Sequence, residues 1–387
     1  MALASESAKR LGAADPRRIE LWVRAGGRCE FPTCNRYLLH DEVTGWTEVF
    51  LGEFAHIVSC ADTGVRADPN LTKDQKEEVA NQLLLCPACH SLIDKKKLEN
   101  DLSRERLLTY KREHEERIYY LSQIAPDRRT TVLRLAGRIR GNSVGISADE
   151  VRTAVVRESG RFPAFPFNRH DIDIDLRAID EGTPGYWDTS RHLIDQRLQQ
   201  LLNTGLDERP IAHLSVFGLA RIPLLVYLGY ALGDKIPTEI YEKQRTPGEG
   251  WCWHGDQESV TFEYEEISSG STNDTVLLLS VSGKIGVDGL PADVRDSNRI
   301  IEVRPCGTAP ARGIIRNSAS LAAFRRTFQE TLRQVEAVGS NGRISVFPAI
   351  PAAAAITIGR EILRDVTPPL DIYDAGEDGF ELAFSCP

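Results

Sequence analysis

The hydrophobic pattern of the first third of the chain predicts short elements followed by one long helix. Residues 16–25 (PRRIELWVRA) are amphipathic at helical spacing, and two glycines end the pattern. Residues 29–57 have the short apolar runs and turn residues of hairpin strands, and the charged residues 72–80 predict a helix. Apolar residues recur at helical spacing over residues 103–124, so we expect a long surface helix there. Pro126 predicts the end of this helix and a domain boundary beside it.

The pattern of the remaining chain predicts an α/β region behind a small adapter. Residues 131–161 have the pattern of a helical adapter, so we expect a linker over residues 125–164. After it, strand-like runs alternate with helical ones, which is typical of α/β folds. The predicted strands lie in DIDIDL, AHLSVFG, TEIYEKQ, SVTFEYEEI and TVLLLSVSG, and the predicted helices lie over residues 190–202 and 223–232.

An internal repeat with an offset of 130 residues runs through this region. The segment LSVFGLARIPLLVYLGYALGDKIPTEIY resembles ISVFPAIPAAAAITIGREILRDVTPPLDIY, and Gly229 of the first copy matches Gly359 of the second. A duplication explains the shared residues better than chance likeness between two βαβ units, which is the alternative. Ligands of doubly wound sheets bind outside the carboxyl ends of the strands, so we expect residues 218–223 and 348–352 to form pocket walls.

Composition and charge restrict the class of protein. At 387 residues, the chain is long enough for two or three domains. No apolar run approaches the roughly 20 residues of a membrane-spanning helix, and the N-terminus lacks the apolar core of a signal peptide, so we expect a cytoplasmic protein without membrane contact. The net charge of −9 arises after residue 140, because the preceding residues are slightly positive. The first part can therefore approach a polyanion such as DNA, whereas the second must place its basic residues locally if it binds a phosphate ligand.

Four of the eight cysteines form two close pairs, C-x4-C at Cys29 and Cys34 and C-x2-C at Cys86 and Cys89. Two such pairs supply the tetrahedral four-sulfur shell that a structural Zn²⁺ prefers. Because the module around them has a small core, zinc would contribute directly to its folding. The alternative is four unligated buried thiols.

Three polar residues accompany these pairs in the order His56, Asn81 and His90, within a strand histidine followed by N-x-x-x-L-C-x-x-C-H. This order resembles the HNH endonuclease family over residues 29–97. The resemblance implies a zinc-stapled ββα-metal fold of the α+β class that hydrolyses double-stranded DNA. It implies His56 as the general base and His90 as a ligand of a catalytic Mg²⁺. Asn81 would orient His56 or hold the loop geometry.

The chain departs from the HNH pattern at one position. Many members of the family carry an acidic residue immediately before the first histidine, whereas this chain has Ala55. Glu53 and Asp94 are candidate replacements in the magnesium shell, because Asp94 follows His90 by one helical turn. Ordinary solvated surface charges are the alternative for both carboxylates.

A nuclease module followed by a duplicated α/β region resembles the HNH–SAVED effectors of bacterial CBASS antiphage systems. The likeness extends over residues 165–387 and includes SVFGLARIPLLVYLG, EKQR…WCW, LLLSVSGKI and SVFPAIPAAAAI. It implies an α/β SAVED domain of two CARF-like, Rossmann-like units that binds a cyclic di- or oligonucleotide. Binding would drive formation of a homo-oligomer, a dimer or tetramer, and DNA cleavage. The candidate ligand-binding residues are Arg221, Gln244, Arg245, Trp251, Trp253, Lys284, Pro348 and Pro351.

The aromatic and the basic candidate residues have different roles in that site. Trp251 and Trp253 alternate on a predicted strand and can stack a base, whereas burial in the core is the alternative for each. Arg245 and Lys284 can meet ligand phosphates.

The sequence predicts a nuclease domain over residues 1–124, the linker, and two sensor units over residues 165–285 and 286–387. Two other functions stay open: a restriction-type endonuclease whose second half reads DNA, and a zinc-binding adapter without catalysis.

Overall fold

The computed structural model describes residues 15–39, 50–163, 172–207, 211–244, 250–255, 257–296, 298–337, 342–364, 366–376 and 379–386. The chain divides into two compact units, Met1–Ala125 and Pro126–Pro387. Among the described residues, no helix combines the length and apolar character that crossing a membrane requires. Arg245, a predicted ligand-binding residue, lies outside the described part of the chain.

The first unit is built on an antiparallel hairpin followed by a helix. Strand β1 (Glu53–His56) pairs with β2 (Gln82–Leu85), and helix α4 (Pro87–Ile93) follows β2 directly. Pro87 stands at the first helical position, where its missing N–H costs no hydrogen bond. The other elements of the unit are α2 (Pro16–Arg24), α3 (Lys73–Lys76), α5 (Arg104–Ser122) and the single turns Val79–Asn81 and Lys96–Leu98.

The helices of the first unit confirm most of the predicted pattern. Helix α2 ends at Arg24, just before the two glycines, and α5 fills the predicted long segment. The predicted helix over residues 72–80 is shorter than expected, because α3 ends at Lys76. A capping box at Thr72 and Gln75 begins α3, so its start is encoded locally. Most of the predicted strand WTEVF lies outside the described residues.

The second unit contains two parallel sheets with the same internal strand order. In the first sheet, β7 (Ile172–Asp175), β3 (Arg129–Ala136), β8 (Leu214–Leu219) and β9 (Thr238–Tyr241) are parallel neighbours. In the second sheet, β12 (Arg299–Pro305), β11 (Thr275–Ser280), β13 (Ile344–Ala349) and β14 (Leu370–Ala375) repeat that order. Short or antiparallel strands extend the edges, namely β6 (Phe162–Pro163), β10 (Phe262–Ser268) and β15 (Phe380–Cys386); β4 (Arg138–Ile139) and β5 (Asn142–Ser143) form a separate hairpin.

The repeat extends to side-chain packing. Phe217 of β8 stacks on Tyr241 of β9, with ring centroids 4.3 Å apart. Phe347 of β13 stacks on Tyr373 of β14 at 4.4 Å. Trp251 and Phe380 each meet the phenylalanine of their own copy edge-on, at 5.0 Å. This correspondence of aromatic clusters supports a duplication.

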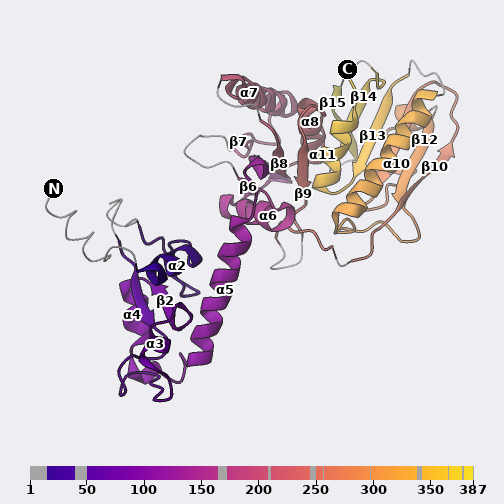
Figure 1. The fold of residues 1–387 in the computed structure, drawn as a ribbon. Helices are drawn as coiled ribbons and strands as arrows, with labels where there is room; N and C mark the ends of the chain where they lie inside the picture. Colours follow the sequence, from indigo (N-terminus) through magenta and orange to yellow (C-terminus); the bar gives the residue numbers. More distant parts are fainter. Residues whose placement is uncertain are drawn as a thin grey trace. The chain divides into compact units, whose positions relative to one another are not determined.

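Helices α8 (Ile222–Leu232) and α11 (Ala352–Glu361) join the two copies, and Figure 1 shows them side by side between the sheets. A Cβ at Gly229 would lie 2.1 Å from the carbonyl oxygen of Ile356, and a Cβ at Gly359 would lie 2.0 Å from that of Val226. The repeated glycine is therefore required by the close approach of the two backbones. Helices α7 (Tyr186–Asp207) and α10 (Ser318–Ala337) also contribute to one core shared by both sheets.

Two predicted boundaries are wrong. Residues 125–164 were expected to be a linker, but β3 lies inside the first sheet between β7 and β8, and α6 (Ala148–Ser159) packs on the outer face of that sheet. The first α/β unit therefore begins near residue 129, not at 165. The predicted division between residues 285 and 286 also fails, because β11 pairs with β12 and β13 of the second sheet. The short helix α9 (Ala292–Arg295) lies between β11 and β12.

Candidate functional site

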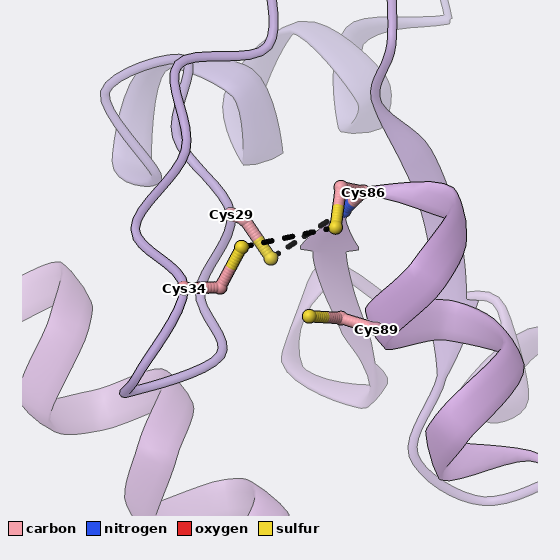
Figure 2. A group of neighbouring side chains, drawn as sticks. All are labelled: Cys29, Cys34, Cys86 and Cys89. Carbon is pink, nitrogen blue, oxygen red and sulfur yellow. Dashed lines mark hydrogen bonds between the residues drawn. The ribbon is translucent and has the colours of Figure 1, made fainter. Parts of the chain in front are cut away.

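The two cysteine pairs of the first unit come together as predicted (Figure 2). Their four sulfur atoms lie within 4.8 Å of one another, and the Sγ atoms of Cys34 and Cys86 are 3.8 Å apart. Zn–S bonds of about 2.3 Å in a tetrahedron place sulfur atoms about 3.8 Å apart. The cluster therefore fits a structural zinc ion.

The electrostatics of this cluster also favour a cation. Burial raises the pKa of the Cys29 thiol to about 12, and burial together with the neighbouring sulfurs raises that of Cys89. Without a cation, several thiolates cannot share this space. A bound divalent ion would instead lower the pKa values of these thiols, because metal coordination stabilises the thiolate form.

Helix α4, whose N-cap is Cys86, positions His90 beside the four-cysteine cluster, directly after Cys89. His90 Nδ1 lies 2.8 Å from Glu53 Oε2 of β1, and its Nε2 lies 3.4 Å from Asp94 Oδ2, one helical turn further on. Each carboxylate proposed for a magnesium shell thus contacts His90, but at a different nitrogen of the ring, so the three side chains do not converge on one point. Alternation along β1 places Glu53 on the same face as Ala55, the position where the HNH pattern has its acidic residue.

His56 lies in a second group of side chains. Its Nε2 is 3.5 Å from Glu77 Oε1 and 3.5 Å from Gln82 Nε2. Gln82 is the antiparallel partner of His56 in the hairpin, and its amide also donates to the backbone carbonyl oxygen of Glu77 at 3.2 Å. Among the described contacts, no hydrogen bond or ion pair joins His56 to His90.

Asn81 holds the loop geometry, which was one of the two roles considered for it. Its buried side chain accepts a hydrogen bond from the backbone N–H of Val58 at 2.9 Å. It donates to the carbonyl oxygens of Val58 at 3.0 Å and Lys76 at 2.8 Å. These bonds fix the chain after β1 and the end of α3, whereas the contacts to the His56 ring come from Glu77 and Gln82.

Sequence reasoning did not identify Glu77 and Gln82. Gln82 could have been found only from the register of the hairpin, which pairs it with His56 across 26 residues. Glu77 stands in a run of charged residues that looks like a solvated surface.

In the second unit, the carboxyl edges of the two sheets meet. Arg221 follows β8 and caps α8; its Nε lies 2.6 Å from Asp374 Oδ2 of β14, and its Nη1 lies 3.2 Å from Glu181 Oε1. Glu242 follows β9 and occupies in the first copy the position that Asp374 occupies in the second, directly after the repeated Ile-Tyr. It accepts a hydrogen bond at 2.7 Å from the backbone N–H of Ala353 in α11. Burial raises the pKa of Asp374, while Arg221 opposes the shift.

The other predicted ligand residues have different environments. Lys284 is exposed on the loop after β11, Pro348 lies in β13, and Pro351 caps α11. These positions surround the carboxyl ends of the second sheet. Arg312, which sequence reasoning missed, is exposed on the loop after β12, and that loop contacts the β11 loop through Ala311 and Val281.

Two predicted ligand contacts are wrong. Trp251 is 2% exposed and packs on Phe217 in the core, so it cannot stack a base. Gln244 is buried, and its amide donates to the carbonyl oxygen of Cys252 at 3.2 Å. The two tryptophans do not share a strand face, because Trp251 forms only an isolated bridge with Lys243.

Trp253 lines a cavity of about 310 Å³ between the end of α11, α10 and β9. Four carboxylates line it (Glu158, Asp234, Glu239 and Glu361) against two arginines, Arg325 and Arg360. This acidic balance is unfavourable for a ligand with several phosphates. The facing carboxyl edges of the sheets are the better candidate for a nucleotide.

Comparison with known proteins identifies part of the chain. A search of curated proteins finds no match. Similar solved structures include an Acinetobacter baumannii Cap4 SAVED/CARF-domain containing receptor with the cyclic trinucleotide 2′3′3′-cAAA, at 13% identity and a TM-score of 0.45, covering 77% of this chain and 61% of that one. The Moraxella osloensis Cap4 receptor is 12% identical, with a TM-score of 0.41, and the match covers 76% of this chain and 60% of the receptor. This chain thus spans about three fifths of the length of those receptors.

The family comparison matches residues 194–385 to the SMODS-associated and fused to various effectors sensor domain, abbreviated SAVED. The match begins within α7 and includes α8, α11 and the second sheet. The chain therefore carries a SAVED sensor domain over residues 194–385.

Proposed function

We propose that this chain is a cyclic-nucleotide-activated, metal-dependent DNA endonuclease, with an HNH nuclease in the first unit and a nucleotide sensor in the second. The observation that carries the proposal is one polypeptide with a SAVED domain and a four-cysteine cluster beside His90 and the β1–β2 hairpin. A sensor domain implies an output activity, and this first unit has the residue types for phosphodiester hydrolysis.

In this proposal, His56 takes the proton from the attacking water. Glu77 and Gln82 hold the imidazole from one side, which fixes the orientation of the ring. Asn81 fixes the chain on both sides of this group through its three hydrogen bonds to backbone. His90 would hold Mg²⁺ through one ring nitrogen, together with the carboxylate at that nitrogen, Glu53 or Asp94, and the ion supplies Lewis-acid stabilisation of the phosphate when bound. A carboxylate and an imidazole are suitable donors for that ion, and water would fill its remaining positions.

The nucleotide would bind where the carboxyl edges of the two sheets meet. Arg221, Lys284 and Arg312 supply positive charge there, and the amino ends of α8 and α11 point to the same edges. Arg221 is paired with Asp374 and Glu181, so an anionic ligand would compete with these carboxylates for the guanidinium. Ligand binding would thereby alter a contact between the two copies, which is a physical route from binding to oligomerisation.

A plasmid assay tests the proposal. Purified protein is incubated with supercoiled plasmid and Mg²⁺, with or without a panel of cyclic di- and trinucleotides that includes 2′3′3′-cAAA and 3′3′3′-cAAA. We expect cleavage only with one of the nucleotides and loss of cleavage in His56→Ala. Cleavage without nucleotide supports the restriction-type endonuclease, and absence of cleavage with every nucleotide supports the adapter. Cleavage by His56→Ala at the wild-type rate overturns the assignment of the base.

A further inference from the structure

A second group of metal-ligating side chains lies around His56, separate from the four cysteines. A ring nitrogen of His56, Cys60 Sγ and a carboxylate oxygen of Glu77 all lie within 4.8 Å of one another. Cys60 Sγ is 3.3 Å from Glu77 Oε1, and His56 Nε2 is 3.5 Å from the same atom. We propose that His56, Cys60 and Glu77 form a binding site for Zn²⁺ that inhibits the nuclease.

The distances within the group match the requirements of zinc. Zn²⁺ binds imidazole nitrogen and carboxylate oxygen at about 2.0–2.2 Å and thiolate sulfur at about 2.3 Å, so tetrahedral ligands lie about 3.3–3.6 Å apart. The 3.5 Å between His56 Nε2 and Glu77 Oε1 falls in this range, and the 3.3 Å between Cys60 Sγ and Glu77 Oε1 is about 0.2 Å shorter than a zinc-bound sulfur–oxygen pair. Three protein ligands leave the fourth position to water, as in open zinc sites.

The backbone around the group is held in place. Val58, which Asn81 binds through both its N–H and its carbonyl oxygen, lies two residues from His56 and two from Cys60. The same amide binds the carbonyl oxygen of Lys76, next to Glu77. Asn81 is buried, so one side chain fixes the backbone positions from which all three ligands project. Zinc would therefore bind a group that is already assembled, with little ordering cost.

The chemistry of the three ligands selects against Mg²⁺. A thiolate is a soft ligand, favoured by zinc and disfavoured by magnesium, which prefers oxygen ligands and retains its water. The Cys60 thiol donates a hydrogen bond to Glu77 in the free protein, and zinc binding would release the thiol proton to solvent as the thiolate forms.

The consequence for activity rests on the proposed function. Zinc on a ring nitrogen of His56 would use the one basic lone pair of the neutral imidazole, so none would remain to accept a proton from water. Zinc at this site would therefore stop cleavage even when Mg²⁺ is in large excess. The binding itself does not depend on the nuclease proposal, so the two can be tested separately.

Metal stoichiometry tests the site directly. Full-length protein is dialysed against buffered free Zn²⁺, and bound zinc is measured by mass spectrometry. We expect two zinc ions per wild-type chain and one in Cys60→Ser, because the four-cysteine cluster is left intact. Cys306→Ser is the matched control, since Cys306 is also an exposed free thiol, and it should keep two ions. Equal zinc content in wild type and Cys60→Ser overturns the proposal.

Two further measurements test whether the Cys60 thiolate binds the metal and whether zinc at this site inhibits cleavage. Co²⁺ added to protein with one zinc ion should produce a thiolate-to-cobalt absorption band in wild type and in Cys306→Ser, but not in Cys60→Ser. In the plasmid assay with Mg²⁺ and nucleotide, the zinc concentration that halves cleavage should rise at least about tenfold in Cys60→Ser. A band that persists in Cys60→Ser, or unchanged inhibition of that variant, contradicts the proposal. If wild type never cleaves, the nuclease proposal fails, and the stoichiometry still decides the zinc site.

Discussion

At the scale of single residues, a few buried polar side chains determine how the active groups are held. Asn81 is a clear case, because the HNH resemblance left two roles open for it and its hydrogen bonds identify one. His56 is held instead by Glu77 and Gln82, which no motif singled out. A motif therefore identifies the reactive residue types, whereas the residues that position them become visible only with strand register and loop packing.

A buried histidine makes the stability of the second unit depend on pH. His213 is buried beside Thr130, and burial, with Arg161 and Arg128, lowers its pKa to about 4. Unfolding exposes it to its ordinary value of about 6.5. The unfolded state then binds more protons between these values, so stability is complete above pH 6.5 and declines as the pH falls toward 4. The decline should be on the order of 3 kcal/mol.

Replacement of His213 tests this dependence. His213→Gln should flatten the change in the free energy of unfolding between pH 7 and pH 4.5, read from hydrogen exchange of β8 peptides in a urea series. His192→Gln, at an exposed position on α7, should leave the wild-type dependence unchanged. A His213→Gln variant with the same pH dependence as wild type would show that other groups cause it.

At the scale of elements, strands with long-range partners were the hardest to predict. The strand β8 and its helix α8 lie where the sequence pattern placed them. By contrast, β3 was assigned to a helical adapter, because a central parallel strand has no strict polar alternation and its identity depends on β7 and β8. Trp251 was misplaced for a similar reason, since its burial depends on Phe217, 34 residues earlier in the chain.

The crossing of α8 and α11 gives an element-scale prediction. Gly229→Ala or Gly359→Ala would force the two helices apart, because each new Cβ would meet backbone of the other helix at about 2 Å. We expect a loss of about 1–3 kcal/mol in the free energy of unfolding of the second unit, measured by hydrogen exchange in urea. Gly182→Ala is the control, because nothing lies within 4 Å of its Cβ position. An effect no larger than that of the control would mean that the helices adjust without cost.

At the scale of the whole molecule, metal removal should affect one unit only. The first unit has a small core joined to the four-cysteine cluster, whereas the second has a large core shared by two sheets. A strong zinc chelator should therefore increase hydrogen exchange in β1, β2 and α4 and leave β8 and β13 protected. Cys86→Ser should reproduce the effect without chelator, and Cys306→Ser should not. Unchanged protection of the hairpin after complete zinc removal would show that zinc is not needed for its fold.

The division of the chain into a cysteine-containing first unit and a duplicated second unit was predictable in outline, because the cysteine spacing and the repeat are both visible in one sequence. The SAVED match at residues 194–385 agrees with the predicted sensor region. The exact ligand contacts were less accessible, since Arg221 meets Asp374 across 153 residues and the two carboxyl edges come together only in the folded unit. Sequence patterns locate elements and reactive residue types, whereas contacts between copies of a repeat require the tertiary structure.

The central claim is that one chain couples nucleotide sensing to DNA cleavage. The most direct test measures the plasmid cleavage rate and nucleotide binding over the same range of cyclic trinucleotide concentrations, with wild type and His56→Ala in Mg²⁺. We expect the cleavage rate of wild type to rise with the occupancy of the sensor and to reach half its maximum at the concentration that half-fills it. His56→Ala should bind equally and cleave nothing. Saturable binding with a cleavage rate that does not change would contradict the coupling.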